Sequence, residues 1–104
     1  SPGTIIFSVS GHVNKPGNYE LPLGISFNEL LNYAGGMQNN KPLKAVIPGG
    51  SSTKVLPADI IQSCTMDYES LQDAGSALGT GAVIVIAEGT CMVELLKRIS
   101  NLSL

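Results

Sequence analysis

The stretch A-V-I-P-G-G-S-S-T-K-V-L-P, residues 45–57, predicts two short strands joined by a tight turn. Residues 45–47 are apolar throughout, and residues 54–56 form the expected second strand. Between them, Pro48 lacks the N–H that a strand ladder needs, and the two glycines that follow it tolerate positive φ. We expect the rest of the chain to be arranged around this pair.

A β-hairpin is predicted upstream of this stretch. Residues 4–13 place apolar side chains on one face and polar side chains on the other. Ile6 interrupts the polar face, so we expect that face to be partly covered. The turn Asn14-Lys15-Pro16-Gly17 follows, and residues 17–23 return, with Pro22 marking a sheet edge or the end of the strand.

A helix after the hairpin has well-marked ends. Ser26 is the expected N-cap, and Glu29 completes a capping box. One apolar stripe follows at helical spacing, formed by Phe27, Leu30, Leu31 and Ala34. Gly35-Gly36 predicts the end of the helix, because glycine adopts the left-handed conformation of a C-terminal cap.

The segments after residue 57 differ in regularity. Residues 57–73 are irregular, with a single turn expected at 67–71, whereas residues 82–87 are apolar on both faces, which indicates a central strand. Thr90 is the expected N-cap of a last helix. Its apolar stripe consists of Met92, Leu95, Leu96, Ile99 and Leu102.

These elements predict an α+β fold of the ubiquitin-like β-grasp type. We expect a mixed sheet of about four or five strands crossed by one helix, with an additional C-terminal helix. A chain of 104 residues has room for one such domain. The domain is expected at residues 1–89, and residues 90–104 are expected to begin a helix that leads out of it.

Composition excludes several classes of protein. A net charge of −2 argues against a nucleic-acid partner, which requires a basic face. No apolar run reaches the roughly 18 residues of a membrane span, so no direct membrane insertion is expected. No signal peptide is expected at the first residues. Two cysteines are too few for a disulfide framework or a zinc site and favour a reducing compartment.

Two glycine-rich loops are candidates for anion binding. Gly79-Thr80-Gly81 precedes a strand, whereas a dinucleotide loop follows a strand and opens a helix, so close packing against a neighbour is the favoured interpretation. The loop of Pro48, Gly49, Gly50, Ser51 and Ser52 is the candidate interdomain or ligand-facing loop. Its backbone N–H groups offer an anion nest as the alternative to a structural turn, which is favoured.

The remaining chemistry-bearing residues form no catalytic constellation in the sequence. His12 is the only histidine, and a surface or loop-contact role is favoured for it over a catalytic one. Cys64 and Cys91 are far apart, and buried small hydrophobic side chains are the default for such cysteines. Asp67 and Glu69 are not spaced as a catalytic dyad. The residues therefore indicate a non-catalytic module.

A series of motifs in a fixed order resembles a known family. They are G-T (3–4), F-S-V-S-G-H-V-N-K-P-G (7–17), A-G-G (34–36), L-K-A-V-I-P-G-G-S-S-T-K-V-L-P (43–57), M-D-Y-E-S-L (66–71), G-x-x-L-G-T-G-A-V-I-V (75–85) and T-C-M-V (90–93). Together they resemble the soluble-ligand-binding β-grasp (SLBB) domain of the NADH-binding flavoprotein subunit of respiratory complex I, an NADH–quinone oxidoreductase. Similar domains occur in NAD-linked hydrogenases and formate dehydrogenases.

The resemblance implies a place within a larger redox subunit. In that family a flavin domain binds FMN and NADH, the β-grasp domain follows, and a helical bundle then holds a [4Fe–4S] cluster. This chain matches neither the flavin segment nor the cluster cysteines, so no cofactor or metal is expected within it. It is expected to be the middle domain, which holds the flavin domain and the bundle in fixed relation for electron transfer.

The same resemblance implies partners and a location. The partners are the flavin domain, the iron–sulfur bundle and other peripheral-arm subunits, on the cytoplasmic side of the inner membrane. Met92, Leu95, Leu96 and Ile99 form the expected bundle interface. Two alternatives remain open, a free-standing SLBB module that binds a small ligand and a ubiquitin-like adaptor.

Overall fold

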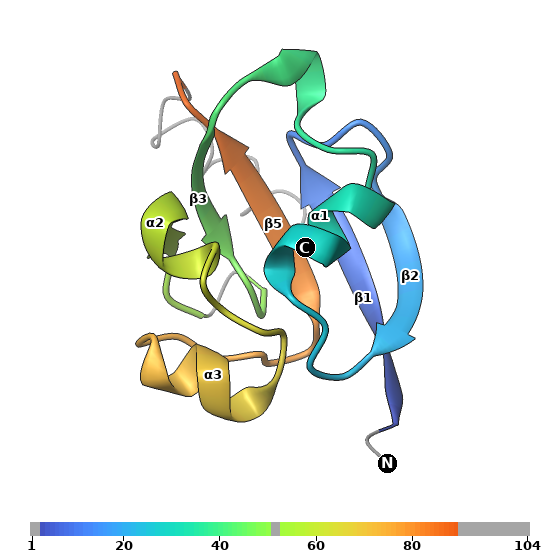
Figure 1. The fold of residues 1–104 in the computed structure, drawn as a ribbon, viewed down its shortest axis with the longest axis vertical. Helices are drawn as coiled ribbons and strands as arrows, with labels where there is room; N and C mark the ends of the chain where they lie inside the picture. Colours follow the sequence, from blue (N-terminus) through green and yellow to red (C-terminus); the bar gives the residue numbers. More distant parts are fainter. Residues whose placement is uncertain (1–2, 51–52, 90–104) are drawn as a thin grey trace.

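In the part of the chain that the structure describes, the sheet has five strands in the order β2-β1-β5-β3-β4. The computed structural model describes residues 3–50 and 53–89 (Figure 1). The strands are β1 (Thr4–Gly11), β2 (Gly17–Pro22), β3 (Leu43–Ile47), β4 (Leu56–Pro57) and β5 (Ala82–Ala87). β1 and β2 pair antiparallel as the predicted hairpin, whereas β5 pairs parallel with β1 and antiparallel with β3. The central position predicted for residues 82–87 is therefore confirmed.

Helix α1 (Phe27–Tyr33) begins and ends where the sequence predicts. The backbone N–H of Glu29 donates to Ser26 Oγ over 3.1 Å, and Ser26 Oγ donates in turn to the Glu29 carboxylate at 3.3 Å. At the other end, Gly36 N donates to Leu31 O at 3.0 Å and Gly35 adopts a φ of 83°, which is the Schellman arrangement. The helix crosses the sheet in front of β1 and β5 (Figure 1).

Three predicted strands are shorter than expected, the one predicted at residues 17–23 by a single residue, because it ends at Pro22. The strand predicted at residues 4–13 ends at Gly11, where φ is 92° and an added Cβ would lie 2.2 Å from Val85 O. Val13 instead forms an isolated bridge with Met37. The strand predicted at 54–56 is wrong for its first two residues, because only Leu56 and Pro57 pair with β3.

The region expected to be irregular contains two short helices. They are α2 (Ala58–Ile61) and α3 (Tyr68–Asp73). Earlier in the chain, a 3₁₀ turn, η1 (Gln38–Asn40), precedes β3. α3 extends the single turn that the sequence predicts at 67–71. α2 was missed because it has only four residues and no side chain caps its first turn.

The apolar residues separate onto the two faces of the sheet. Val83 and Val85 belong to the main core, which also contains Phe7 and the buried residues of α1, α2 and α3. Ile84 and Ile86, which alternate with those valines, belong to a second cluster of strand residues that also contains Ala45 and Ile47. Ile6, which we expected to be partly covered, is 55% exposed.

Candidate functional site: the paired glycine loops

The two glycine-rich loops meet because of the register between β3 and β5. These strands are antiparallel, and Ile47 at the end of β3 pairs with Ile84 near the start of β5. The loop that leaves β3 and the loop that enters β5 therefore lie at the same end of the sheet. We call Pro48–Gly50 together with Leu78–Gly81 the paired glycine loops.

The two loops approach each other more closely than any side chain would allow. A Cβ added to Gly49 would lie 2.5 Å from Ala77 O and 2.5 Å from Leu78 O, and one added to Gly79 would lie 2.5 Å from Gly49 O. Both Pro48 and Gly49 are buried. The contact is therefore backbone against backbone, which agrees with the close packing predicted for residues 79–81.

Thr53 closes the first of these loops. Gly49 N donates to Thr53 Oγ1 at 3.2 Å, and Thr53 Oγ1 donates to Gly50 O at 2.9 Å. Thr53 N also donates to Gly50 O at 3.1 Å. An anion nest needs free N–H groups, and the Gly49 donor is already used, so these bonds favour the structural turn. Ser51 and Ser52 lie outside the described residues.

His12 makes a loop contact at the opposite end of the sheet. Its imidazole Nδ1 accepts a hydrogen bond from the backbone N–H of Ala87 at 3.1 Å. The backbone of His12 also pairs at both groups: its N–H donates to Val85 O at 2.9 Å, and its carbonyl accepts from Gln38 N. The β3–β5 register shifts here between Leu43 and Ala45. The imidazole thus accepts a hydrogen bond from a backbone N–H where the β3–β5 ladder is irregular, which is the loop contact that the sequence predicts.

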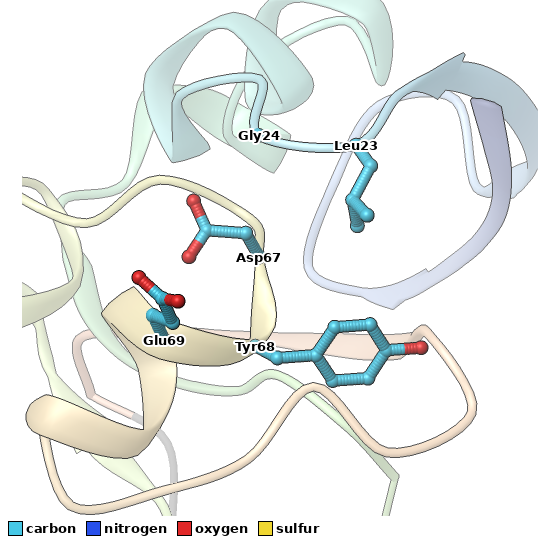
Figure 2. A pocket seen from close by; sticks show the side chains of 5 residues that line it. All are labelled: Leu23, Gly24, Asp67, Tyr68 and Glu69. Atoms are coloured by element: carbon cyan, nitrogen blue, oxygen red, sulfur yellow. The ribbon is translucent and has the colours of Figure 1, made fainter. Parts of the chain in front are cut away.

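An open hollow of about 410 Å³ lies between the end of β2 and the start of α3. Figure 2 shows the Asp67 and Glu69 carboxylates on one side of it and the Tyr68 ring on the other, below Leu23. Tyr68 is 58% exposed. The hollow offers an apolar wall and an acidic wall, both accessible to water.

The Asp67 carboxylate in this hollow caps α3. It accepts from Thr65 Oγ1 at 2.6 Å and from Ser70 N at 2.7 Å, and these two bonds lower the pKa of Asp67. A general acid at neutral pH needs a raised pKa instead. Asp67 is therefore an ionised helix cap, and it does not form a proton-sharing dyad with Glu69.

The described residues do not fit the cofactors that the resemblance implies for the whole subunit. Cys64 is buried and free, and its Sγ donates to Ile60 O at 3.3 Å. Within residues 3–50 and 53–89, no group of three His, Cys, Asp or Glu side chains could hold a metal. The space in front of Gly79, where a phosphate would approach a dinucleotide loop, is filled by Gly49.

The predicted site residues fall into two groups, those that the structure brings together and those that lie outside the described residues. Pro48, Gly49 and Gly50 form the paired loops with a segment that the sequence alone does not connect to them. Cys91 and the predicted bundle interface, Met92, Leu95, Leu96 and Ile99, lie outside the described residues. The sequence reasoning missed two contacts: the hydrogen bond from Thr53 Oγ1 to Gly50 O, which closes the turn, and the one from Ser76 Oγ to Lys54 O, which joins the segments beside the two loops.

No helix in the described part of the chain is long and apolar enough to cross a membrane. The strand order, together with helix α1 crossing the sheet, defines a β-grasp domain. Residues 6–85 match the family model of the SLBB domain, and the chain belongs to that family.

Curated relatives show where SLBB domains of this kind occur. The chain is 50% identical over 100 residues to one of the NADH-quinone oxidoreductase subunits of Rhizobium meliloti (strain 1021), a match that covers 95% of this chain and 24% of the relative. It is 48% identical over 98 residues to the corresponding NADH-quinone oxidoreductase subunit in Mycobacterium bovis, covering 94% and 22%. The chain thus spans about a quarter of the length of these relatives.

Solved structures give the same fold. An NAD⁺-reducing [NiFe]-hydrogenase in its air-oxidised state matches with a TM-score of 0.71 and 27% identity, over 90% of this chain and 15% of the hydrogenase chain. The same class of enzyme in its H₂-reduced state matches equally well, at 26% identity. The resemblance drawn from the sequence motifs, to the SLBB domain of the complex I flavoprotein subunit, is therefore confirmed.

Proposed function

We propose that this domain is a rigid spacer within the NADH-oxidising subunit of an NADH–quinone oxidoreductase. It holds the FMN- and NADH-binding domain and the [4Fe–4S] bundle in fixed relation, and it takes no part in the chemistry itself. Its partners are those two domains and other subunits of a peripheral arm on the cytoplasmic side of the inner membrane. The same domain of an NAD-linked hydrogenase would have the same role.

One observation carries this proposal: β1 begins and β5 finishes at opposite ends of the sheet. β1 and β5 are parallel neighbours, with Gly11 level with Val85. Thr4, where β1 begins, and Ala87, where β5 ends, are therefore separated along the sheet by about nine residue steps, roughly 30 Å. Figure 1 shows the start of β1 at the bottom of the view and the end of β5 at the top.

The connection between these two points is a single hydrogen-bonded ladder inside a well-packed core. Val83 and Val85 of β5 and Phe7 and Val9 of β1 are all at most 3% exposed. The ladder continues through β3 to the paired glycine loops, where the backbones of Gly49 and Gly79 meet. Because a close-packed interior has low compressibility, a displacement at one end of the domain is transmitted to the other end, as a rigid spacer requires.

The proposal is tested by disturbing the packing without touching a cofactor. In the intact subunit, Gly49→Ala forces the paired loops apart, because the new Cβ would overlap Leu78 O. Gly17→Ala is the matched control, since an added Cβ at Gly17 meets nothing within 4 Å. Flavin reduction by NADH is followed by absorbance, and cluster reduction by electron paramagnetic resonance after rapid freezing.

We expect Gly49→Ala to slow cluster reduction by about tenfold or more while flavin reduction keeps its rate, because donor and acceptor lose their fixed geometry. Gly17→Ala should change neither rate. Equal rates in both variants, under conditions where Gly49→Ala measurably lowers the thermal stability of the domain, would refute the spacer function.

A further inference from the structure

Among the described strands, β2 and β4 lie at the two edges of the sheet, and they are built differently. β4 has only two residues and ends in Pro57, which cannot donate to a ladder. β2 has six residues, and its register with β1 is unbroken. Short strands, prolines, lysines and bulges keep an edge from pairing with another chain. β2 carries none of these before Pro22, its last residue, so this edge is open to a further strand.

One hydrogen bond establishes which backbone groups of β2 point outward. Leu23 N donates to Gly3 O at 3.0 Å, one step beyond the first residue pair of β1 and β2. Hydrogen-bonded and non-hydrogen-bonded pairs alternate along an antiparallel ladder, so every second residue counted back from Leu23 faces β1. The residues between them direct their backbone groups away from β1, and they are Asn18, Glu20 and Pro22.

The outward backbone groups of Asn18 and Glu20 are open to solvent. Both residues are exposed, and within the described residues their outward N–H and C=O groups have no hydrogen-bond partner. The outward carbonyl of Pro22 is already used, because it accepts from Ile25 N at 3.1 Å. The open segment therefore consists of two donors and two acceptors, arranged symmetrically on either side of Tyr19.

This open segment is complementary to itself. When two copies of β2 run antiparallel with Tyr19 opposite Tyr19, each Asn18 is level with Glu20 of the other copy. Each of these two pairs exchanges two N–H···O=C hydrogen bonds, so every outward donor and acceptor of Asn18 and Glu20 is used on both copies. The arrangement has a two-fold axis at Tyr19, as the symmetric interface of a homodimer requires.

The side chains favour the same register. Asn18 Oδ1 accepts from Ser8 Oγ at 2.8 Å, which leaves the side-chain N–H groups of Asn18 for the Glu20 carboxylate of the second copy. A shift of two residues in one direction sets Glu20 opposite Glu20, which places like charges against each other. The same shift in the other direction sets Glu20 opposite Pro16, which has no N–H to donate.

We propose that the β2 edge pairs with the β2 edge of a second copy of the chain, with Tyr19 opposite Tyr19. The occupant is a second copy because the open segment supplies all the partners that its own backbone groups need. Four hydrogen bonds form only a small contact, so the pairing is weak, with a dissociation constant of about 1 mM. This proposal does not depend on the spacer function.

The test measures self-association of the isotope-labelled 104-residue chain by sedimentation equilibrium and NMR, from about 0.05 to 5 mM. Hydrogen exchange is followed at the amides of Asn18 and Glu20, and the amides of Tyr19 and Leu21, which face β1, report whether the sheet stays folded. Asn18→Glu and Asn18→Lys then change the charge opposite Glu20. Ser8→Glu and Ser8→Lys are the matched controls, because Ser8 is exposed and level with Asn18 but lies one strand further from the second copy.

We expect the chain to dimerise over this range, with the Asn18 and Glu20 amides gaining protection as the concentration rises while the amides that face β1 stay protected throughout. Asn18→Glu should weaken the dimer by about fivefold, and Asn18→Lys should strengthen it by a similar factor. The Ser8 variants should change the dissociation constant by less than about twofold, because salt screens the longer distance.

A chain that stays monomeric throughout this range would overturn the proposal. So would a dimer that Asn18→Glu weakens no more than Ser8→Glu does, because the contact would then lie elsewhere or in another register. A dimer whose formation leaves the Asn18 and Glu20 amides unprotected would also refute it.

Discussion

The backbone N–H of Ala87 donates a hydrogen bond to Nδ1 of His12 over 3.1 Å, between residues 75 positions apart in the chain. It joins the end of β5 to the residue that follows β1, at the point where the β3–β5 register shifts. Ala87 is buried, so its polar backbone needs partners within the protein. The one histidine is thus part of the scaffold at the end of the sheet where β5 finishes.

Replacing this histidine should weaken the fold. His12→Ala removes the imidazole acceptor and should lower the free energy of unfolding by about 1 kcal/mol, the usual net value of such a bond. His12→Asn, which keeps a short side-chain acceptor, should lose less. Urea denaturation of the two variants measures this, and equal midpoints for wild type and His12→Ala would show that the bond contributes nothing.

The Ser26 cap is a second local test. Ser26→Ala removes the acceptor of the Glu29 N–H and should cost about 1 kcal/mol, because that N–H has no partner within the helix. Ser26→Asp keeps an acceptor at the same place and should be near wild type. If the three proteins unfold at the same midpoint temperature, the cap contributes nothing to the stability of the domain.

The pH dependence of α3 follows from Asp67. Bonds from Thr65 and Ser70 lower its pKa below the ordinary value of 3.8. A depressed carboxylate stabilises the fold above the unfolded pKa, and the stabilisation is lost as pH falls through the folded pKa. The stability difference between wild type and Asp67→Asn should therefore be constant above about pH 5 and shrink below about pH 3.8. A difference unchanged down to about pH 2.5 would contradict this.

Cys64 should be unpaired and protected. It is 4% exposed and packs in the main core, with its thiol donating to Ile60 O. A thiol titration of the native Cys91→Ser variant should give no rapid reaction, and unfolding without reductant should release one free thiol. Finding none after unfolding would mean that Cys64 is oxidised.

The sequence predicted correctly those elements whose ends or faces are specified by a few neighbouring residues, namely α1 and the central strand. Ser26, Glu29 and Gly35 mark both ends of α1, and the two-sided apolar pattern of residues 82–87 marks the central strand. Gly11 and Lys54 illustrate the failures. The alternation of β1 continues to Val13, and only the approach of Val85 to Gly11 ends the strand. Lys54 follows the turn as a strand residue would, but β4 pairs with β3 only from Leu56 onward.

The candidate site was predicted only in part, for a similar reason. The sequence indicates that residues 48–50 turn and that residues 79–81 pack closely. Which neighbour they pack against depends on the register of β3 with β5, a pairing of residues about 40 positions apart that no local pattern encodes. The His12–Ala87 bond depends in the same way on β1 lying parallel to β5.

The spacer function is tested most directly by loosening one end of the spacer. In the intact subunit, four Gly and Ser residues are inserted after Gly3, where the chain enters β1. The control insertion of the same four residues is placed at Lys15 in the exposed hairpin turn, which lies off the path from Thr4 to Ala87.

Cluster reduction by NADH is then timed by rapid freezing and electron paramagnetic resonance, with flavin reduction timed by absorbance. If the domain sets the relation between flavin and cluster, the insertion after Gly3 slows cluster reduction by about tenfold or more, leaves flavin reduction unchanged, and the insertion at Lys15 does neither. Cluster reduction at the wild-type rate with the insertion after Gly3 would contradict the account.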